Sequence, residues 1–358
     1  MYRCYWLLVL IITGNLLPKT GAAQTFSTAF KPFTGTPRSY VCKRTFDSIR
    51  IDGHLDEDSW KAATWSSDFT DIEGSRMPAP NYRTRIKLLW DEKYLYIAAW
   101  LQEPHVWATL KDHDAIIFHD NDFEVFIDPD GDSHQYFELE INALNTVMDL
   151  FMNKPYRNGG QAMLNWDTKG LLTAVSVNGT LNNPNDIDSS WTVEMAIPFS
   201  ALRYFGEKER PADGNTWRIN FSRVEWDTDI RDGKYVKRGN PEHNWVWSAQ
   251  DIINMHAPER WGYLQFSEQK ANAGTVAFKM PAEEEIKQQL WLAYYAQQEY
   301  RFKNGRYASA AAQLKLAAGK YPLQIEGISG QFTATIKVPS LQKSISINQE
   351  GKIWSDKL

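Results

Sequence analysis

Short segments in which apolar and polar residues alternate recur along two thirds of this chain, and they restrict its fold more than any other feature of the sequence. Turn-forming Gly, Asn, Asp and Pro residues separate them, as expected for strands that reverse direction at the surface. Many short strands at such spacing are typical of a β-sandwich. Residues 41–270 are therefore predicted to form a mainly β, jelly-roll-like sandwich. The clearest segments cover residues 85–90, 94–100, 123–128, 136–141, 191–197, 217–222 and 262–266.

The pattern changes after Lys270, where a short connector leads into a different kind of domain. Acidic residues at 283–285 open a segment with helical apolar spacing, and Gly305 lies where that helix should end. A second, shorter helix is expected at 307–318. Alternating segments then return, which predicts a small α+β domain over residues 282–358. These segments cover residues 332–338, 344–347 and 352–354.

The N-terminus has the pattern of a secretory signal over residues 1–23, with cleavage expected after Ala23. Its apolar run is shorter than the ~20 residues that a membrane-spanning helix needs, and no later stretch is long enough. Residues 24–40 are predicted to be an arm or linker. Removal of the signal leaves Cys42 alone, so no internal disulfide can form. We therefore expect a secreted or periplasmic protein, and the net charge of −5 gives no basic footprint for nucleic acid.

Five motifs in the predicted sandwich, in order, resemble those of the family 9 carbohydrate-binding modules. The first is an Asp-Gly turn followed by acidic residues and Trp60, and another is the Trp-x-x-Glu-x-x-Ile-Pro strand that begins at Trp191. The resemblance implies a β-sandwich that binds sugar, often beside glycoside hydrolases and sometimes with structural calcium. The matching segments are residues 51–63, 89–96, 121–128, 191–199 and 255–262.

The resemblance also implies a site, in which two Trp side chains clamp a sugar ring. The matching positions here are Phe118 and Met255, so the clamp is weakened or moved. Glu124 matches a carboxylate that binds sugar hydroxyls, whereas Glu140 stands where the family has an Arg. Trp226, Trp245 and Trp247 could replace the clamp, although Trp245 and Trp247 are equally well explained as core, and Arg157 or Arg223 could replace the missing cation.

Two acidic clusters suggest metal chemistry. Asp128, Asp130 and Asp132 surround a Gly turn and could hold a structural calcium ion, although Asp, Pro and Gly are also what an ordinary hairpin turn favours. Asp112 to Asp122 form a second cluster that includes His113 and His119. Two histidines six residues apart do not have a familiar metal-ligand spacing, so both are interpreted as polar loop residues.

Three functions remain open. The first is non-catalytic binding of mono- or oligosaccharide ends in polysaccharide uptake or catabolism. The second is glycoside hydrolysis, which needs two facing carboxyl groups, but no pair stands out among Glu124, Glu138, Glu140 and Glu194. The third is an envelope adaptor that has lost sugar binding and contacts a protein partner through its C-terminal domain.

Overall fold

The alternating segments form strands, and these strands fold into one large sheet. The computed structural model describes residues 30–203 and 210–358, so the predicted signal peptide lies outside the described residues. The sheet has 13 strands, and its main path runs in the order β8-β7-β6-β5-β11-β15-β1-β3-β4-β10-β9, while β14 pairs with β11 and β2. Its strands are β1 (Ser39–Arg44), β2 (Thr70–Asp71), β3 (Thr84–Trp90), β4 (Tyr94–Gln102), β5 (Asp122–Asp128), β6 (Tyr136–Asn142), β7 (Val147–Met152), β8 (Ala162–Met163), β9 (Leu172–Asn178), β10 (Ser190–Pro198), β11 (Thr216–Glu225), β14 (His243–Val246) and β15 (Gly262–Lys270).

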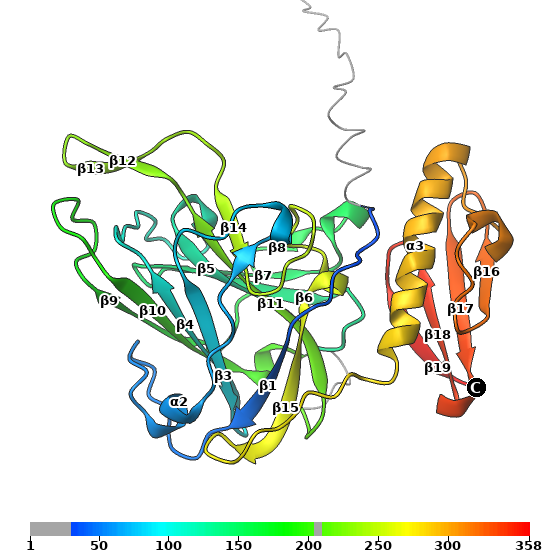
Figure 1. Cartoon of the computed structure of the whole chain (residues 1–358), viewed down its shortest axis with the longest axis horizontal. Coiled ribbons are helices and arrows are strands. Elements are labelled where there is room, and N and C mark those ends of the chain that lie inside the picture. The colour runs from blue at the N-terminus through cyan, green and yellow to red at the C-terminus, as the bar shows by residue number, and fades with distance from the viewer. Residues whose placement is uncertain (1–29, 204–209) are drawn as a thin grey trace, which may run out of the picture.

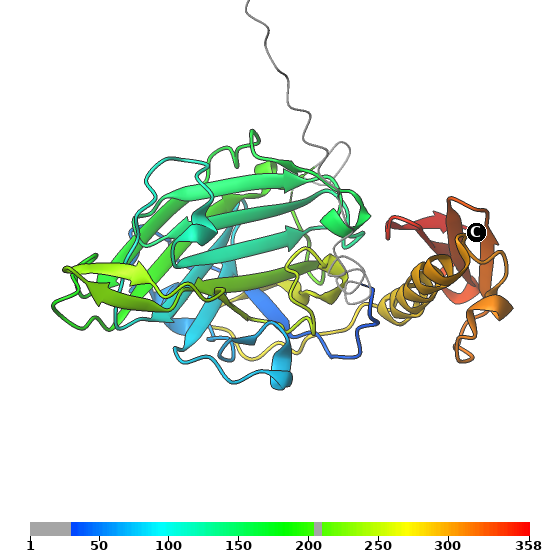
Figure 2. The same ribbon diagram turned by 90° about the horizontal axis from the view of Figure 1, so that it is seen from above.

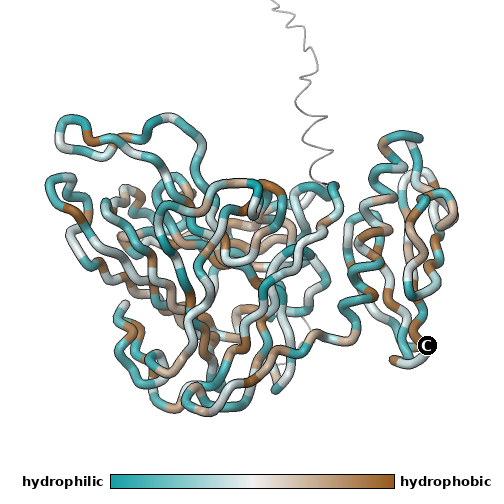
Figure 3. Tube along the Cα trace, viewed as in Figure 1, coloured by the Kyte–Doolittle hydropathy of each residue, from teal (hydrophilic) through white to brown (hydrophobic). Residues whose placement is uncertain are grey.

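The sheet curves over on itself into two facing layers, visible in Figures 1 and 2, so the predicted β-sandwich is confirmed. One hydrophobic core lies between the layers and contains residues of β3, β4 and β10 together with residues of β5, β6 and β11. Phe123, Val125 and Ile127 of β5 enter this core, and the alternate residues of the strand face outward. Figure 3 shows the mixture of hydrophobic and hydrophilic residues along the strands. Cys42 is buried and free.

Two of the sequence motifs meet at the carboxylate of Glu194. It accepts hydrogen bonds from Trp60 Nε1 at 2.8 Å and from the backbone N–H groups of Asp52 and Gly53 at 3.0 Å each. Gly53 has a φ of +84°, and a Cβ there would lie 2.8 Å from the backbone nitrogen of Ser176, so only glycine fits the turn. Trp60 belongs to the short helix α2 (Asp58–Ala62). These contacts explain why the two motifs occur in one chain.

Shorter elements lie in the connections of the sandwich. The hairpin β12 (Thr228–Arg231) and β13 (Lys234–Lys237) projects from one end of it (Figure 1). The remaining elements are 3₁₀ turns: η1 (Gly74–Arg76), η2 (Ile117–His119), η3 (Tyr156–Asn158), η4 (Phe199–Ala201) and η5 (Pro258–Arg260).

The C-terminal region forms a separate helix-and-sheet unit, as the sequence predicts. Helix α3 (Glu284–Asn304) ends at Gly305, which has the left-handed φ of +70°, and it packs on a four-stranded sheet through a second hydrophobic cluster. The strands are β16 (Leu323–Gly327), β17 (Phe332–Val338), β18 (Lys343–Asn348) and β19 (Ile353–Lys357), with a 3₁₀ turn η7 (Pro339–Leu341). Within the described residues, no helix is long and apolar enough to cross a membrane.

The second helix expected at 307–318 is wrong, because that segment contains only the 3₁₀ turn η6 (Ala311–Leu314). The side-chain amide of Gln297 on α3 explains the difference. It accepts a hydrogen bond from the backbone N–H of Ala308 at 2.8 Å and donates one to the same residue's carbonyl at 3.0 Å. These backbone groups are therefore bound to α3, and the chain lies against α3 without starting a new helix.

A buried ion pair between two loops of the sandwich lies where the C-terminal unit makes contact. Arg157 donates two parallel hydrogen bonds to Glu259, at 2.9 and 2.8 Å, and both side chains are at most 3% exposed. Tyr295 of α3 donates a 2.6 Å hydrogen bond to the same carboxylate, and Tyr294 donates one of 2.7 Å to Asn158. Because Arg157 and Glu259 belong to η3 and η5, the C-terminal unit holds two loops of the sandwich.

Candidate functional site

The outer face of β5, β6 and β7 carries a groove of about 410 Å³ whose floor is acidic. Alternation along β5 and β6 turns Glu124, Glu138 and Glu140 to this face while their neighbours enter the sandwich core. Glu124 lies directly opposite Glu140 in the register of the two strands. All three are at most 5% exposed, yet all three line the groove, so their carboxyl groups are what a ligand on the floor would meet.

The floor brings carboxyl groups together without a charged basic partner: His256 Nε2 lies 3.6 Å from Glu138, but burial lowers the pKa of His256 to about 3, so its imidazole stays neutral. Glu242 also lines the groove, and none of its described lining residues is Lys or Arg. Burial raises the pKa of Glu124 and Glu140 well above the usual range, and each has a neighbouring carboxylate that adds to the effect. Burial and the charge of Glu124 raise the pKa of Glu138 to about 8. One oxygen of Glu124 has no hydrogen-bond partner, so the site has unused capacity to accept hydrogen bonds.

Phe118 and Tyr156 mark the two ends of the groove. The backbone N–H of Phe118 donates a 2.9 Å hydrogen bond to Glu140, which places this ring at the Glu140 end. Tyr156 packs edge-on against His256, with ring centroids 4.4 Å apart. His256 lies at the opposite end of β6, where its Nδ1 is 2.9 Å from the hydroxyl of Tyr136. The rim therefore offers apolar faces above an acidic floor.

Three predicted binding residues, Phe118, Glu124 and Met255, line this groove together. Trp226 is not in the lining, but its Nε1 donates a 2.8 Å hydrogen bond to the carbonyl of Phe118, and Lys237 lies 3.5 Å from its ring centroid. Trp226 thus supports the Phe118 turn from behind.

Trp245 and Trp247 do not form a ligand platform, because both belong to the sandwich core and are 3% and 1% exposed. They do share one side of an extended segment, but β14 pairs with β11 in a register that turns this side inward. Asn244 and Val246 alternate with the two indoles and point to the other side of the strand, where Asn244 belongs to the groove lining. The core explanation of the two indoles is therefore the correct one.

Neither candidate arginine reaches the groove. Arg157 is taken up by Glu259, as described above. Arg223 is fully buried and pairs with Glu103 at 2.6 Å and Glu225 at 2.8 Å. The replacement of the family's Arg by Glu140 is therefore not compensated by either of these residues.

Sequence reasoning did not assign Tyr156 and His256 to the site, and it considered Glu138 only among the carboxyl groups that hydrolysis could use. The signal for Glu138 was present, because residues 136–141 alternate and Glu138 and Glu140 must share a face with each other. Tyr156 and His256 lie in loops far apart in the sequence, and no local pattern brings them together. Tyr156 is 48% exposed, which makes it a candidate for one side of the missing clamp.

The proposed calcium ligands form a hydrogen-bonded turn between β5 and β6. Asp128 accepts hydrogen bonds from the backbone N–H groups of Gly131 and Ser133 at 2.9 Å each. Asp132 accepts one from His134 at 2.7 Å. Oxygens of the three aspartates lie within 4.8 Å of one another, and each retains lone pairs, so the set fits an oxygen-ligated ion. These bonds equally explain the acids as turn formers, and calcium here stays a prediction.

Comparisons with known proteins agree with the motifs. The model of the family described as "Carbohydrate family 9 binding domain-like" matches residues 51–269. No curated protein matches. Among solved structures, a candidate carbohydrate-binding protein from Bacteroides uniformis is similar to this chain, with 17% sequence identity and a TM-score of 0.48. The match covers 65% of this chain and 100% of the Bacteroides chain. Two structures of a family 9 carbohydrate-binding module from Caldicellulosiruptor kristjanssonii were also found. The cellotriose complex is 17% identical (TM-score 0.40, 66% and 99% covered), and the glucose complex is 16% identical (TM-score 0.39, 66% and 100% covered). The family match covers more than half of the chain, and the chain therefore belongs to the carbohydrate family 9 binding domain-like family.

Proposed function

We propose that the groove binds the end of a mono- or oligosaccharide and does not cleave it. The observation that carries this proposal is the combination of an acidic floor and an apolar, aromatic rim in one groove. A sugar has the same two kinds of surface, since its hydroxyls bind carboxylates while its C–H faces pack on aromatic rings. Family membership supports the same assignment.

The acidic floor of the groove restricts which kinds of sugar can bind there. Four glutamates line the groove and none of its described lining residues is Lys or Arg, so the carboxylate of a uronic acid would find no cation to pair with there. Neutral sugars can donate hydroxyl hydrogen bonds to the carboxylates, and amino sugars can in addition form charge-assisted ones. We infer a neutral or amino sugar as the ligand. In an exported protein, such binding would serve polysaccharide uptake or breakdown, and the C-terminal unit would offer a surface for an envelope partner.

Calorimetry with three sugars tests the proposal: a neutral glucose oligomer, an amino-sugar oligomer and a glucuronic acid oligomer. We expect binding of at least one of the first two in the micromolar-to-millimolar range, and none of the third. Phe118→Ala should weaken binding about tenfold, because it removes an aromatic contact. Glu124→Gln should weaken it as well. Ile230→Ala, an exposed apolar residue on β12 outside the groove lining, is the matched control and should leave affinity unchanged. Equal binding of all three sugars, or of none, contradicts the proposal.

One observation favours a second candidate, glycoside hydrolysis. The pKa of Glu138 is raised to about 8, as a general acid requires, and two further carboxyl groups lie beside it. Release of reducing sugar from a polysaccharide panel, lost in Glu138→Gln, would establish this activity. We expect no release, because binding alone accounts for the site.

A further inference from the structure

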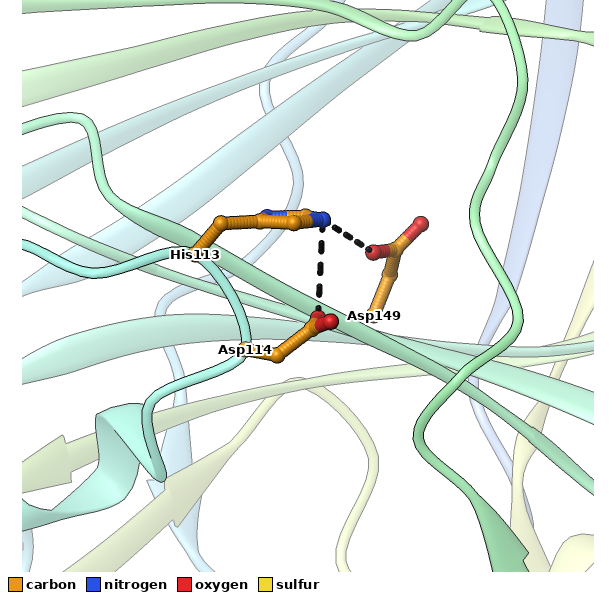
Figure 4. A group of neighbouring side chains, drawn as sticks. All are labelled: His113, Asp114 and Asp149. Atoms are coloured by element: carbon orange, nitrogen blue, oxygen red, sulfur yellow. Dashed lines mark ion pairs between the residues drawn. The ribbon is translucent and has the colours of Figure 1, made fainter.

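A second group of polar side chains lies on the opposite side of β7 from the groove. Met148 and Leu150 line the groove, so alternation turns Asp149, which lies between them, to the other face of the strand. Two loops bring further ligand-type residues to it. His113 and Asp114 come from the loop before η2 (Figure 4), and Asp167, from the loop after β8, also contacts His113.

The imidazole of His113 is the centre of this group. Its Nε2 lies 3.2 Å from an oxygen of Asp167, 3.5 Å from one of Asp114 and 3.7 Å from one of Asp149. Figure 4 shows Asp114 and Asp149 approaching the same ring nitrogen from two directions. In a tetrahedral site with metal–ligand distances of 2.0–2.2 Å, neighbouring donors lie about 3.3–3.6 Å apart. The distances from Nε2 to the oxygens of Asp114 and Asp149, 3.5 and 3.7 Å, are close to this spacing, and ligand atoms of His113, Asp114 and Asp149 all lie within 4.8 Å of one another.

Two of the oxygens have no hydrogen bond although they are buried. Asp149 is 2% exposed and its Oδ1, the atom that faces His113, has no hydrogen-bond partner. Oδ1 of Asp114 also faces His113 and also has no hydrogen-bond partner. A buried carboxylate oxygen without a partner is costly, and a cation would remove that cost.

The ring of His113 is already oriented for coordination. Its Nδ1 lies 2.9 Å from the carbonyl oxygen of Val147, so in the neutral ring Nδ1 carries the proton and donates it there. This leaves the lone pair on Nε2, pointing at the aspartates. Histidines that bind metals commonly donate their other ring N–H to a backbone carbonyl, which holds the ring in one orientation.

We propose that His113, Asp114 and Asp149 bind a divalent first-row transition-metal ion such as Zn²⁺. A mixed nitrogen and oxygen ligand set favours such an ion over Ca²⁺, which prefers oxygen alone. The side chains of His113 and Asp167 are 57% and 69% exposed, so the ion can enter from solvent. Because the loop from His113 continues to Phe118, the ion would also fix one end of the groove.

Isothermal titration of the full chain with Zn²⁺ tests this inference, using protein that carries no histidine tag and has been freed of metal with a chelator. We expect one ion per chain with micromolar or tighter affinity. His113→Gln and Asp149→Asn should each weaken binding at least about tenfold. His54→Gln removes an exposed histidine elsewhere and should change nothing. Zn²⁺ should raise the thermal unfolding temperature more than Ca²⁺ does.

The outcomes are distinct. Absence of Zn²⁺ binding means that the cluster is an ion-pair network only, and binding that survives His113→Gln places the ion elsewhere. Either result overturns the proposal. If Asp149→Asn fails to fold, the exposed His113→Gln variant decides. Sugar affinity is not part of this test, so the metal site can fail or stand independently of the groove.

Discussion

Buried carboxylates occur in two parts of this molecule under opposite conditions. At the contact between the two units, Glu259 is 2% exposed in its side chain and is held by Arg157, Arg260 and Tyr295. In the groove, Glu124, Glu138 and Glu140 are as deeply buried, but they face one another, and their site has no Lys or Arg among its described lining residues. Burial by itself would raise the pKa of both kinds of carboxyl group. The neighbouring Arg157 instead lowers the pKa of Glu259 to about 2, whereas the pKa of Glu138 rises to about 8.

The two groups of carboxylates therefore have different roles, one in stability and the other in binding. A carboxylate with a bidentate arginine has its charge compensated within the protein, so it stabilises the contact that it forms. Carboxylates that repel one another cost folding free energy unless a ligand or protons compensate them. We therefore expect changes at Glu259 to affect folding and changes in the groove to affect binding.

The largest effect is expected from Arg157→Ala. It leaves Glu259 charged and buried, and should lower the free energy of unfolding by about 3–5 kcal/mol. Urea unfolding measures this change. Glu92→Gln, which breaks a pair whose acid is 64% exposed, is the control and should cost less than about 1 kcal/mol. If both variants lose the same small amount, the buried pair does not stabilise the sandwich loops that contact the C-terminal unit.

A smaller effect of opposite sign is expected from Glu138→Gln. The folded-state pKa of Glu138 is raised from 4.5 to about 8, so the stability that its neutral form contributes is complete below pH 4.5 and is lost as the pH rises through about 8. The amide cannot ionise, so at about pH 8 the variant should be more stable than the parent by roughly 1–2 kcal/mol. Thermal unfolding between about pH 5 and 9 measures this. An unchanged pH dependence would show that Glu138 does not titrate in this range.

Glu259 should give the reverse pH dependence. Its pKa is lowered from 4.5 to about 2, so its contribution is present above pH 4.5 and is lost as the pH falls through about 2. The two regions can therefore be distinguished in one protein by the pH range in which each changes stability.

The smallest effect on folding is expected from Tyr156→Ala. The side chain is 48% exposed, so the free energy of unfolding should change by less than about 1 kcal/mol. Sugar affinity should fall several-fold if Tyr156 forms one side of the clamp. Calorimetry of the variant beside urea unfolding checks both values. A large loss of stability with unchanged affinity would assign Tyr156 to structure.

Much of the fold follows from local sequence. Alternation predicted the strands, because successive side chains of a strand point to opposite faces and one of these faces is buried. Gly305 predicted the end of α3, because the left-handed conformation there favours glycine. The family resemblance proposed Phe118, Glu124 and Met255 as binding residues, and the structure places all three in the lining of one groove. The helix expected at 307–318 failed, because Gln297, a residue on another element, binds the backbone that the helix would have used.

What the tertiary structure alone decided is which side of each strand faces the core. The spacing of Trp245 and Trp247 puts both indoles on one side of a strand, and only the pairing of β14 with β11 turns that side inward. In the same way, His113 and Asp149 are distant in sequence and meet because the loop of His113 is hydrogen-bonded to the carbonyl of Val147 at the start of β7. Alternation is a local property of the chain, whereas strand pairing and loop packing depend on contacts between residues far apart.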